Sequence, residues 1–225
     1  MDMFRYMERK FLKKQLLFGN EYVIIRIYSF FVKNAQEENN MEEKSSVEMY
    51  RDRIKRVLIS QEEIAAAIQK AGEEISVSYD GNPILLVSIL KGSFVFLADL
   101  CRAITVPCEI GFMCAKSYYN GTVSAGVVKI TMDLEQDISK YHVIIVEDII
   151  DTGRTLNDVV KLLKTRNPLS LKVVTLLDIP RRRMVDFEAD RVLFTIPDLF
   201  VIGYGLDCAE YYRNLPYIAE YDETK

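Results

Sequence analysis

The residues best suited to chemistry lie in one short stretch that begins with Glu147 and Asp148. The apolar residues before this acidic pair predict a buried strand, so the pair lies at its carboxyl end, where open parallel sheets bind ligands. Residues 151–155 are expected to form a tight loop that leads into a helix beginning near Leu156. A glycine, two threonine hydroxyl groups and the N–H groups of a loop and a helix start together favour a bound phosphate.

The three carboxylates of this stretch need a partner of their own, because Glu147, Asp148 and Asp151 would repel a bare phosphate. Carboxylates accept hydrogen bonds from hydroxyl groups and bind hard cations. A sugar phosphate, with a phosphate at one end and a polyol at the other, meets both requirements. The stretch matches neither the GxxxxGKS/T nor the GxGxxG nucleotide loop. The alternative that needs no ligand is an acidic pair followed by an ordinary capped helix.

The rest of the sequence predicts the elements that position this stretch. Residues 83–104 and 141–168 each contain an apolar strand, a polar break and a helix. Continuously apolar strands separated by helices predict an α/β fold, with a mainly parallel sheet covered by helices on both faces. A further helix is expected after Ser60, which forms a capping box with Glu63.

Two other segments are expected to surround the site. Residues 108–133 predict two strands joined by a long polar excursion at 117–126, which is typical of a mobile lid. Residues 190–218 contain aromatic, glycine and acidic residues with little helical period. We expect this segment to form strands and loops around the ligand.

The length of 225 residues predicts one large domain with an appendage. We place a domain at 46–225 and an extension of uncertain structure at 1–45. The apolar stretch 22–32 is shorter than the roughly 20 residues that span a bilayer. The extension is interpreted as an added strand, a membrane-surface or partner helix, or residues encoded upstream of the true start, because Met41 and Met49 precede the regular pattern. We favour a dispensable extension.

Charge and composition exclude several classes of protein. The net charge of −4 argues against a general nucleic-acid binder, which needs a surplus of Lys and Arg. The single histidine, His142, argues against most zinc sites and most serine or cysteine nucleophile systems, and we assign it no role. The four cysteines contain no CxxC pair and no signal peptide is evident, so free thiols and a cytoplasmic location are expected.

The run VIIVEDIIDTGRT, residues 143–155, resembles the phosphoribosyl-pyrophosphate motif of the type I phosphoribosyltransferases. Other segments narrow the resemblance to the hypoxanthine-guanine phosphoribosyltransferases, and all of them follow the family order from about Val57 to Tyr221. These segments are residues 90–93, 116–118, 196–207 and 210–213.

This resemblance implies a fold and a reaction. The fold is the type I phosphoribosyltransferase fold, a twisted and mainly parallel sheet with a small hood and a flexible loop. The reaction joins hypoxanthine or guanine to phosphoribosyl pyrophosphate, with Mg²⁺ as cofactor, and gives IMP or GMP and pyrophosphate. Members of the family form dimers and tetramers, so a homodimer or homotetramer is expected, with no nucleic-acid or membrane partner.

The resemblance also assigns roles to individual residues. Asp151 is the general base near purine N7, and Glu147 and Asp148 face the ribose hydroxyl groups or their metal, which Asp207 also binds. The 5′-phosphate is held by Asp151, Thr152, Gly153, Arg154 and Thr155. Pyrophosphate is held by Lys91, Gly92, Arg183 and Arg213, with Ser117 and Tyr118 from the flexible loop. The purine contacts Phe200 and Val201.

One position departs from the family pattern. The lysine that hydrogen-bonds the purine 6-oxo group is replaced by Ile179, and the loss of such a bond costs about 1.5 to 3 kcal/mol. Either Arg181 or Arg182 replaces it, or Pro180 shifts the alignment. Two alternatives therefore stay open: a transferase for another base such as xanthine or a pyrimidine, and a non-catalytic regulator that senses phosphoribosyl pyrophosphate or nucleotides.

Overall fold

The computed structural model describes residues 48, 50–118 and 127–224. Internal contacts divide the chain into two units, Met1–Asp52 and Arg53–Lys225, and both sheets of the described residues lie in the second. The predicted extension, residues 1–45, lies outside the described residues. The domain boundary predicted at residue 46 therefore stays a prediction.

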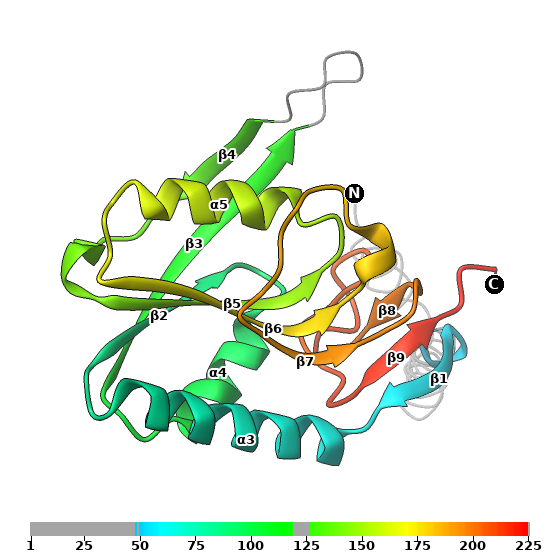
Figure 1. Ribbon diagram of the computed structural model, residues 1–225. Coiled ribbons are helices and arrows are strands. Elements are labelled where there is room, and N and C mark those ends of the chain that lie inside the picture. Colours follow the sequence, from blue (N-terminus) through cyan, green and yellow to red (C-terminus); the bar gives the residue numbers. More distant parts are fainter. Residues whose placement is uncertain (1–47, 49, 119–126, 225) are drawn as a thin grey trace, which may run out of the picture. The chain divides into compact units, whose positions relative to one another are not determined.

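A six-stranded sheet forms the centre of the second unit in the described part of the chain (Figure 1). Its strand order is β4-β3-β2-β5-β6-β7; β2, β3, β5, β6 and β7 are parallel, and β4 is antiparallel to β3. The strands are β2 (Ile84–Ile89), β3 (Cys108–Tyr118), β4 (Val127–Met132), β5 (His142–Ile150), β6 (Ser170–Asp178) and β7 (Arg191–Thr195). The predicted mainly parallel sheet is confirmed.

Helices cover both faces of this sheet (Figure 1). The helices α3 (Gln61–Tyr79) and α4 (Phe94–Ala103) pack on one face, and α5 (Arg154–Lys164) packs on the other. Every residue of β2 is buried, which explains why its sequence is apolar without alternation. Two 3-10 turns also occur in this unit: η1 (Ile138–Lys140) and η2 (Pro180–Arg182).

The predicted capping box begins α3. Ser60 Oγ accepts a hydrogen bond from the Glu63 N–H group at 3.2 Å, and Glu63 Oε2 accepts one from the Ser60 N–H group at 2.8 Å. These bonds satisfy N–H groups that a helix start leaves without intrahelical partners. Ile64, Ile68 and Ala71 then form a buried stripe along α3.

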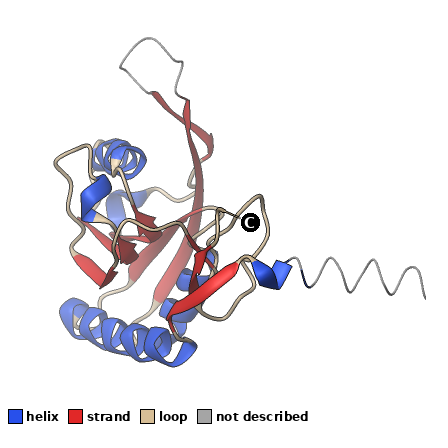
Figure 2. Cartoon of the chain, turned by 90° about the vertical axis from the view of Figure 1, so that its right-hand side faces the viewer, coloured by secondary structure: helices blue, strands red, loops and turns tan. Residues whose placement is uncertain are grey.

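Two further features surround the sheet. A small antiparallel sheet of order β1-β9-β8 pairs the start of the unit with its end, through β1 (Ile54–Ile59), β8 (Val201–Ile202) and β9 (Ile218–Tyr221). This sheet corresponds to the expected hood. Figure 2 shows β3 and β4 extending away from the helices as a two-stranded ribbon. None of the described helices is long and apolar enough to cross a membrane.

Candidate active site

A pocket of about 210 Å³ lies where the parallel strands β2 and β5 end. The loop after β2 contributes one wall, and the end of β5 with the loop before α5 contributes the other. Predicted site residues from both segments meet here, although up to 64 positions separate them in the sequence. Those lining the pocket are Lys91, Gly92, Glu147, Asp148, Asp151, Gly153 and Thr155.

The acidic pair lies within β5 and not after it. The sequence places the end of the strand before Glu147, but β5 continues to Ile150, and Glu147 pairs with Thr175 of β6. Asp148 is 9% exposed, and burial raises its pKa to about 6, with Asp207 raising it and Arg213 lowering it. Burial, together with the charges of Asp148 and Asp151, raises the pKa of Glu147 well above its ordinary value.

This pair has the properties of a cation or hydroxyl site. Glu147 Oε2 is buried and has no hydrogen-bond partner in the described structure. Such a group is stabilised by a cation or a hydroxyl donor. The described residues contain no cluster of three His, Cys, Asp or Glu side chains that would hold a metal unaided. Mg²⁺ is usually bound by one or two carboxylates together with substrate phosphates, so these residues fit that ion.

The loop at residues 151–155 joins β5 to α5. Gly153 caps the helix with a φ of 74°, a left-handed conformation that favours glycine. Because α5 begins at Arg154 and not near Leu156, two further predicted phosphate-binding residues, Arg154 and Thr155, lie in its first turn. Within the loop, the Thr152 N–H group donates to the Asp151 carboxylate and Arg154 N–H to Thr152 Oγ1. The loop therefore presents a helix amino terminus to the pocket.

Gly92 lies directly against the acidic pair. A Cβ atom at this position would lie 1.7 Å from Asp148 Oδ2, a separation that no real side chain adopts. The loop after β2 can therefore approach Asp148 only because residue 92 has no side chain. This contact gives the predicted Lys91-Gly92 pair a physical role in the shape of the pocket.

We expect Gly92→Ala to lower kcat/KM by about 10²-fold, because Asp148 must move by roughly an ångström or more. Steady-state kinetics with both substrates measures the loss. Gly81→Ala is the control: it meets no atom within 4 Å, and its strained φ of 79° affects stability alone. Unchanged kinetics in Gly92→Ala would show that the position of Asp148 has no influence on turnover.

Two of the three cationic residues predicted to bind pyrophosphate, Lys91 and Arg213, belong to an ion-pair network beside the pocket. Lys91 Nζ lies 3.0 Å from Glu210 Oε1, and Arg213 lies 3.1 Å from Glu210 Oε2. Arg213 also lies 2.8 Å from Asp207 Oδ1, and it donates to the Gly205 carbonyl at 2.8 Å. Lys91, Arg213 and the predicted metal residue Asp207 are therefore brought together.

Arg183 lies behind the loop at residues 151–155, the predicted phosphate loop. Its guanidinium group pairs with Asp178 and donates a hydrogen bond to the Asp151 carbonyl. The residues that line the pocket do not include Arg183. Its predicted pyrophosphate contact stays a prediction.

The predicted purine residues lie in or near the hood. The Phe200 ring is half-buried and meets the edge of the Tyr221 ring, with centroids 5.4 Å apart. Val201 begins β8, is buried and pairs with Glu220. Ile179 is fully buried in the core between the sheet and the helices α3 and α4. The nearby Arg182 pairs with Asp198 and donates to the Leu199 carbonyl at 3.4 Å.

The predicted lid residues are described only in part. Ser117 and Tyr118 are the last two residues of β3, and their backbones pair with Val128 and Val127 of β4. Residues 119–126 lie outside the described residues. The two strands that flank the predicted excursion are confirmed, but the excursion predicted to begin at Ser117 begins later, because β3 continues through Tyr118.

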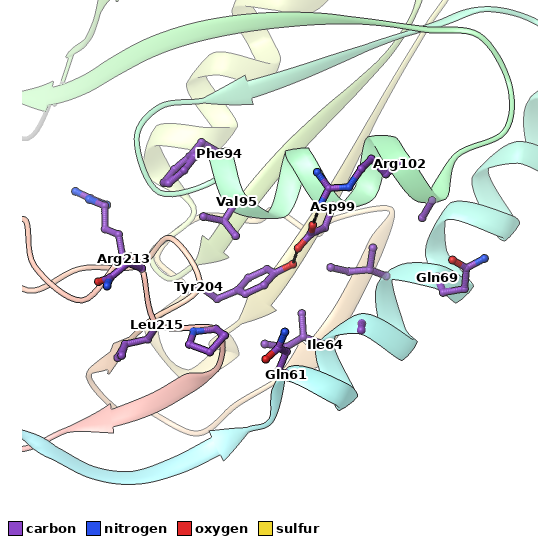
Figure 3. A pocket seen from close by; sticks show the side chains of 15 residues that line it. Gln61, Ile64, Gln69, Phe94, Val95, Asp99, Arg102, Tyr204, Arg213 and Leu215 are labelled. Carbon is purple, nitrogen blue, oxygen red and sulfur yellow. Dashed lines mark hydrogen bonds and ion pairs between the residues drawn. The ribbon is translucent and has the colours of Figure 1, made fainter. Parts of the chain in front are cut away.

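A larger pocket, of about 750 Å³, lies between α3, α4 and the segment from Tyr204 to Pro216 (Figure 3). On its floor, Tyr204 donates a hydrogen bond to Asp99, which also pairs with Arg102. Burial and this bond raise the pKa of Tyr204 far above its ordinary value, so it stays protonated. Arg213 is the one predicted site residue that lines this pocket. The smaller pocket is therefore the candidate active site.

Sequence reasoning missed Asp178 and Glu210. Asp178 ends β6, next to Ile150 at the end of β5, so its place at the carboxyl edge of a parallel sheet is a signal that could have identified it. Glu210 lies in the family segment 210–213 without an assigned role, and its pair with Lys91 spans 119 positions, which no local pattern indicates.

The chain combines a mainly parallel sheet with a buried carboxylate pair and a helix-initiating loop at its carboxyl edge, as the resemblance to the phosphoribosyltransferases predicts. A family model for the phosphoribosyl transferase domain matches residues 53–209. The chain belongs to this family.

Its relatives place it more narrowly, among the hypoxanthine phosphoribosyltransferases. The hypoxanthine phosphoribosyltransferase of Buchnera aphidicola is 50% identical over 167 residues, which cover 73% of this chain and 94% of the relative. The hypoxanthine-guanine phosphoribosyltransferase of Streptococcus pneumoniae is 49% identical over 170 residues, which cover 76% of this chain and 94% of the relative. A crystal structure of a Staphylococcus aureus hypoxanthine phosphoribosyltransferase superposes with a TM-score of 0.74 and 44% identity, covering 77% of this chain and 94% of that one.

Proposed function

We propose that this protein is a purine salvage transferase that joins hypoxanthine or guanine to phosphoribosyl pyrophosphate. The products are IMP or GMP and pyrophosphate. The observation that carries the proposal is the pocket in which the phosphate loop, the pair Glu147 and Asp148 and the Lys91-Gly92 loop all meet. Each part of a phosphorylated sugar with a pyrophosphate leaving group has a matching side chain or loop there.

The reaction forms a bond between a purine nitrogen and ribose C1 and breaks the bond from C1 to the pyrophosphate oxygen. The phosphate loop holds the 5′-phosphate and so fixes the sugar, while Glu147 and Asp148 orient its hydroxyl groups. The Asp151 carboxylate, exposed at the pocket, accepts the proton that purine N7 loses. Nearby carboxylates favour the positive charge that develops on the ribose ring.

Mg²⁺ is the proposed cofactor. Glu147, Asp148 and Asp207 are its proposed ligands, and because the described residues bring no three such side chains into one cluster, one or two of them would hold the ion together with substrate oxygens. When bound, it neutralises charge on the departing pyrophosphate. Lys91, Arg213 and the Gly92 backbone bind the same group. Glu210 forms ion pairs with Lys91 and Arg213 in the free protein, and these pairs would have to break before the two cations bind pyrophosphate.

Phe200 is proposed to stack on the purine, with Val201 contacting its edge through the backbone. The position usually held by lysine is Ile179, so the base preference depends on residues that lie nearby. Hypoxanthine and guanine are the proposed bases, since the relatives above are named for them.

Ile179→Lys is expected to raise the preference for guanine over adenine by about 10- to 150-fold, through a new charge-assisted hydrogen bond to the 6-oxo group. Because Ile179 is fully buried, the ammonium group must reach the pocket, and we expect a lower melting temperature. Ratios of kcat/KM for the two bases measure the change, with Ile179→Met as the uncharged control. An unchanged ratio in a folded Ile179→Lys protein would refute this role.

The decisive test of the proposed function mixes the full chain, Mg²⁺ and phosphoribosyl pyrophosphate with hypoxanthine, guanine, xanthine, adenine or uracil, each separately. Nucleotide formation from hypoxanthine and guanine supports the proposal. Turnover of another base alone would keep the chemistry and change the substrate. Tight binding of phosphoribosyl pyrophosphate without turnover of any base would favour the regulator.

We further propose that the protein works in the cytoplasm as a homodimer or homotetramer, without nucleic-acid or membrane partners. The acidic net charge of −4 supports the absence of a nucleic acid. Sedimentation of the purified full chain measures the oligomeric state.

A further inference from the structure

Arg183 connects the end of β6 to the phosphate loop. One guanidinium nitrogen donates to the Asp178 carboxylate, and the other donates to the backbone carbonyl of Asp151. The side chains of Arg183 and Asp178 are only 17% and 13% exposed. An ion pair with so little water around it is screened weakly and holds a fixed geometry better than a surface pair.

The next residue continues this contact. The Met184 N–H group donates to the Thr152 carbonyl at 3.0 Å, so two consecutive loop carbonyls are bound by the segment that follows η2. Both peptide bonds are trans, and in a trans peptide the C=O and N–H groups point in opposite directions. The N–H groups of Thr152 and Gly153 therefore point away from the carbonyls that Arg183 and Met184 bind, and the Thr152 N–H group donates at 2.5 Å to the carboxylate of Asp151, a residue that lines the pocket.

The orientation of these backbone groups affects how strongly the loop can bind a phosphate. A carbonyl oxygen that turned toward a bound phosphate would repel it, whereas an N–H group attracts it. Arg183 also packs on Gly153, where a Cβ atom would lie 3.0 Å from Arg183 Cδ. The arginine thus supports the loop from behind, through one side-chain contact and one hydrogen bond.

We infer that Asp178 and Arg183 act together as positioning residues that hold the loop in its phosphate-binding conformation. Asp178 fixes the guanidinium group, and Arg183 keeps the Asp151 carbonyl turned away from the ligand. The inference rests on the proposed function, because it takes the 5′-phosphate of the sugar as the ligand of this loop. It assigns Arg183 to the phosphate end of the substrate and not to the pyrophosphate.

The test compares two anions that occupy different ends of the site. Affinities for ribose 5-phosphate and for pyrophosphate with Mg²⁺ are measured separately by calorimetry, in wild type, Asp178→Asn and Arg183→Lys. We expect both variants to bind ribose 5-phosphate about tenfold more weakly, which corresponds to one charge-assisted hydrogen bond. Pyrophosphate affinity should change less than about twofold, and in turnover KM for phosphoribosyl pyrophosphate should rise more than kcat falls.

Matched variants separate positioning from general destabilisation. Asp133→Asn removes a carboxylate that also pairs with an arginine, Arg166, at 2.7 Å but does not line the pocket, and it should leave both affinities unchanged. Asp178→Glu keeps the charge and should restore part of the ribose 5-phosphate affinity, which also serves if Asp178→Asn fails to fold.

Two results would overturn the inference. Loss of pyrophosphate affinity in Arg183→Lys equal to the loss for ribose 5-phosphate would make Arg183 a pyrophosphate ligand. Unchanged ribose 5-phosphate affinity in folded Asp178→Asn would show that Asp178 does not position the loop. Failure of the proposed function is a separate outcome, since it appears as wild-type protein that binds ribose 5-phosphate but converts no base.

Discussion

Replacing Asp151 by asparagine is expected to lower kcat by about 10²- to 10⁴-fold, the usual contribution of general acid–base catalysis. The Asp151 side chain lies at the pocket, and its Oδ1 accepts a hydrogen bond from the Thr152 N–H group. Asparagine keeps an oxygen for that bond, so the loop retains its shape. It cannot accept a proton at neutral pH, so only the chemical step is impaired.

The kinetic pattern distinguishes this role from a structural one. We expect KM for phosphoribosyl pyrophosphate to stay within about threefold of wild type while kcat falls, which is the signature of a group used in the transition state. Asp158→Asn is the control, because Asp158 lies on α5, the helix that follows the loop, and does not line the pocket. A rise in KM with little change in kcat would instead mean that Asp151 mainly binds the substrate.

The sequence predicts the elements whose burial or capping is encoded locally. The strand β2 is apolar throughout because both of its faces are covered, and Ser60 with Glu63 marks the start of α3. In contrast, the sequence predicts a start of α5 that is two residues too late, because Gly153 caps this helix without a side-chain hydrogen bond. It also predicts too early an end of β5, because Glu147 and Asp148 interrupt the apolar pattern that defines a strand.

The contacts that complete the site depend on tertiary structure. The pair of Asp178 with Arg183 spans only five positions, yet it forms because η2 turns the chain back toward the loop. Glu210 meets Lys91 across 119 positions. No local pattern specifies such partners, since an exposed acid and a paired acid look the same in a sequence. The order of the family segments along the sequence predicts most of the site residues, but only the folded structure shows which of these residues contact one another.

Asp148→Asn is expected to stabilise the free protein while it abolishes most of its activity. Burial raises the pKa of Asp148 to about 6, so the folded chain holds its proton more tightly than the unfolded chain does. Above pH 6 the carboxylate is ionised in both states, and the buried charge then lowers the free energy of unfolding by about 3 kcal/mol. As the pH falls below 6, Asp148 takes up a proton and the penalty disappears.

Thermal unfolding of wild type and Asp148→Asn at two pH values measures this effect. At pH 7.5 the asparagine variant should unfold at a higher temperature than wild type, by an amount that corresponds to about 1 to 3 kcal/mol. At pH 5 the difference should shrink, because wild-type Asp148 is then largely neutral. Removing its charge should also lower the pKa of Glu147, which Asp148 raises. Glu135→Gln, at an exposed position outside the pocket lining, should change stability by less than about 0.5 kcal/mol at either pH.

Ligands should reverse the order of stability. Phosphoribosyl pyrophosphate with Mg²⁺ stabilises a protein that binds it in proportion to the logarithm of ligand concentration over Kd. Wild type should therefore gain melting temperature on addition of both, while Asp148→Asn gains little and turns over about 10²-fold more slowly. A variant that is less stable than wild type at pH 7.5, yet still responds to the ligands, would show that Asp148 is a structural carboxylate. The expected reversal in the order of stability requires that the buried charge of Asp148 destabilises the free protein and is needed for binding of phosphoribosyl pyrophosphate with Mg²⁺.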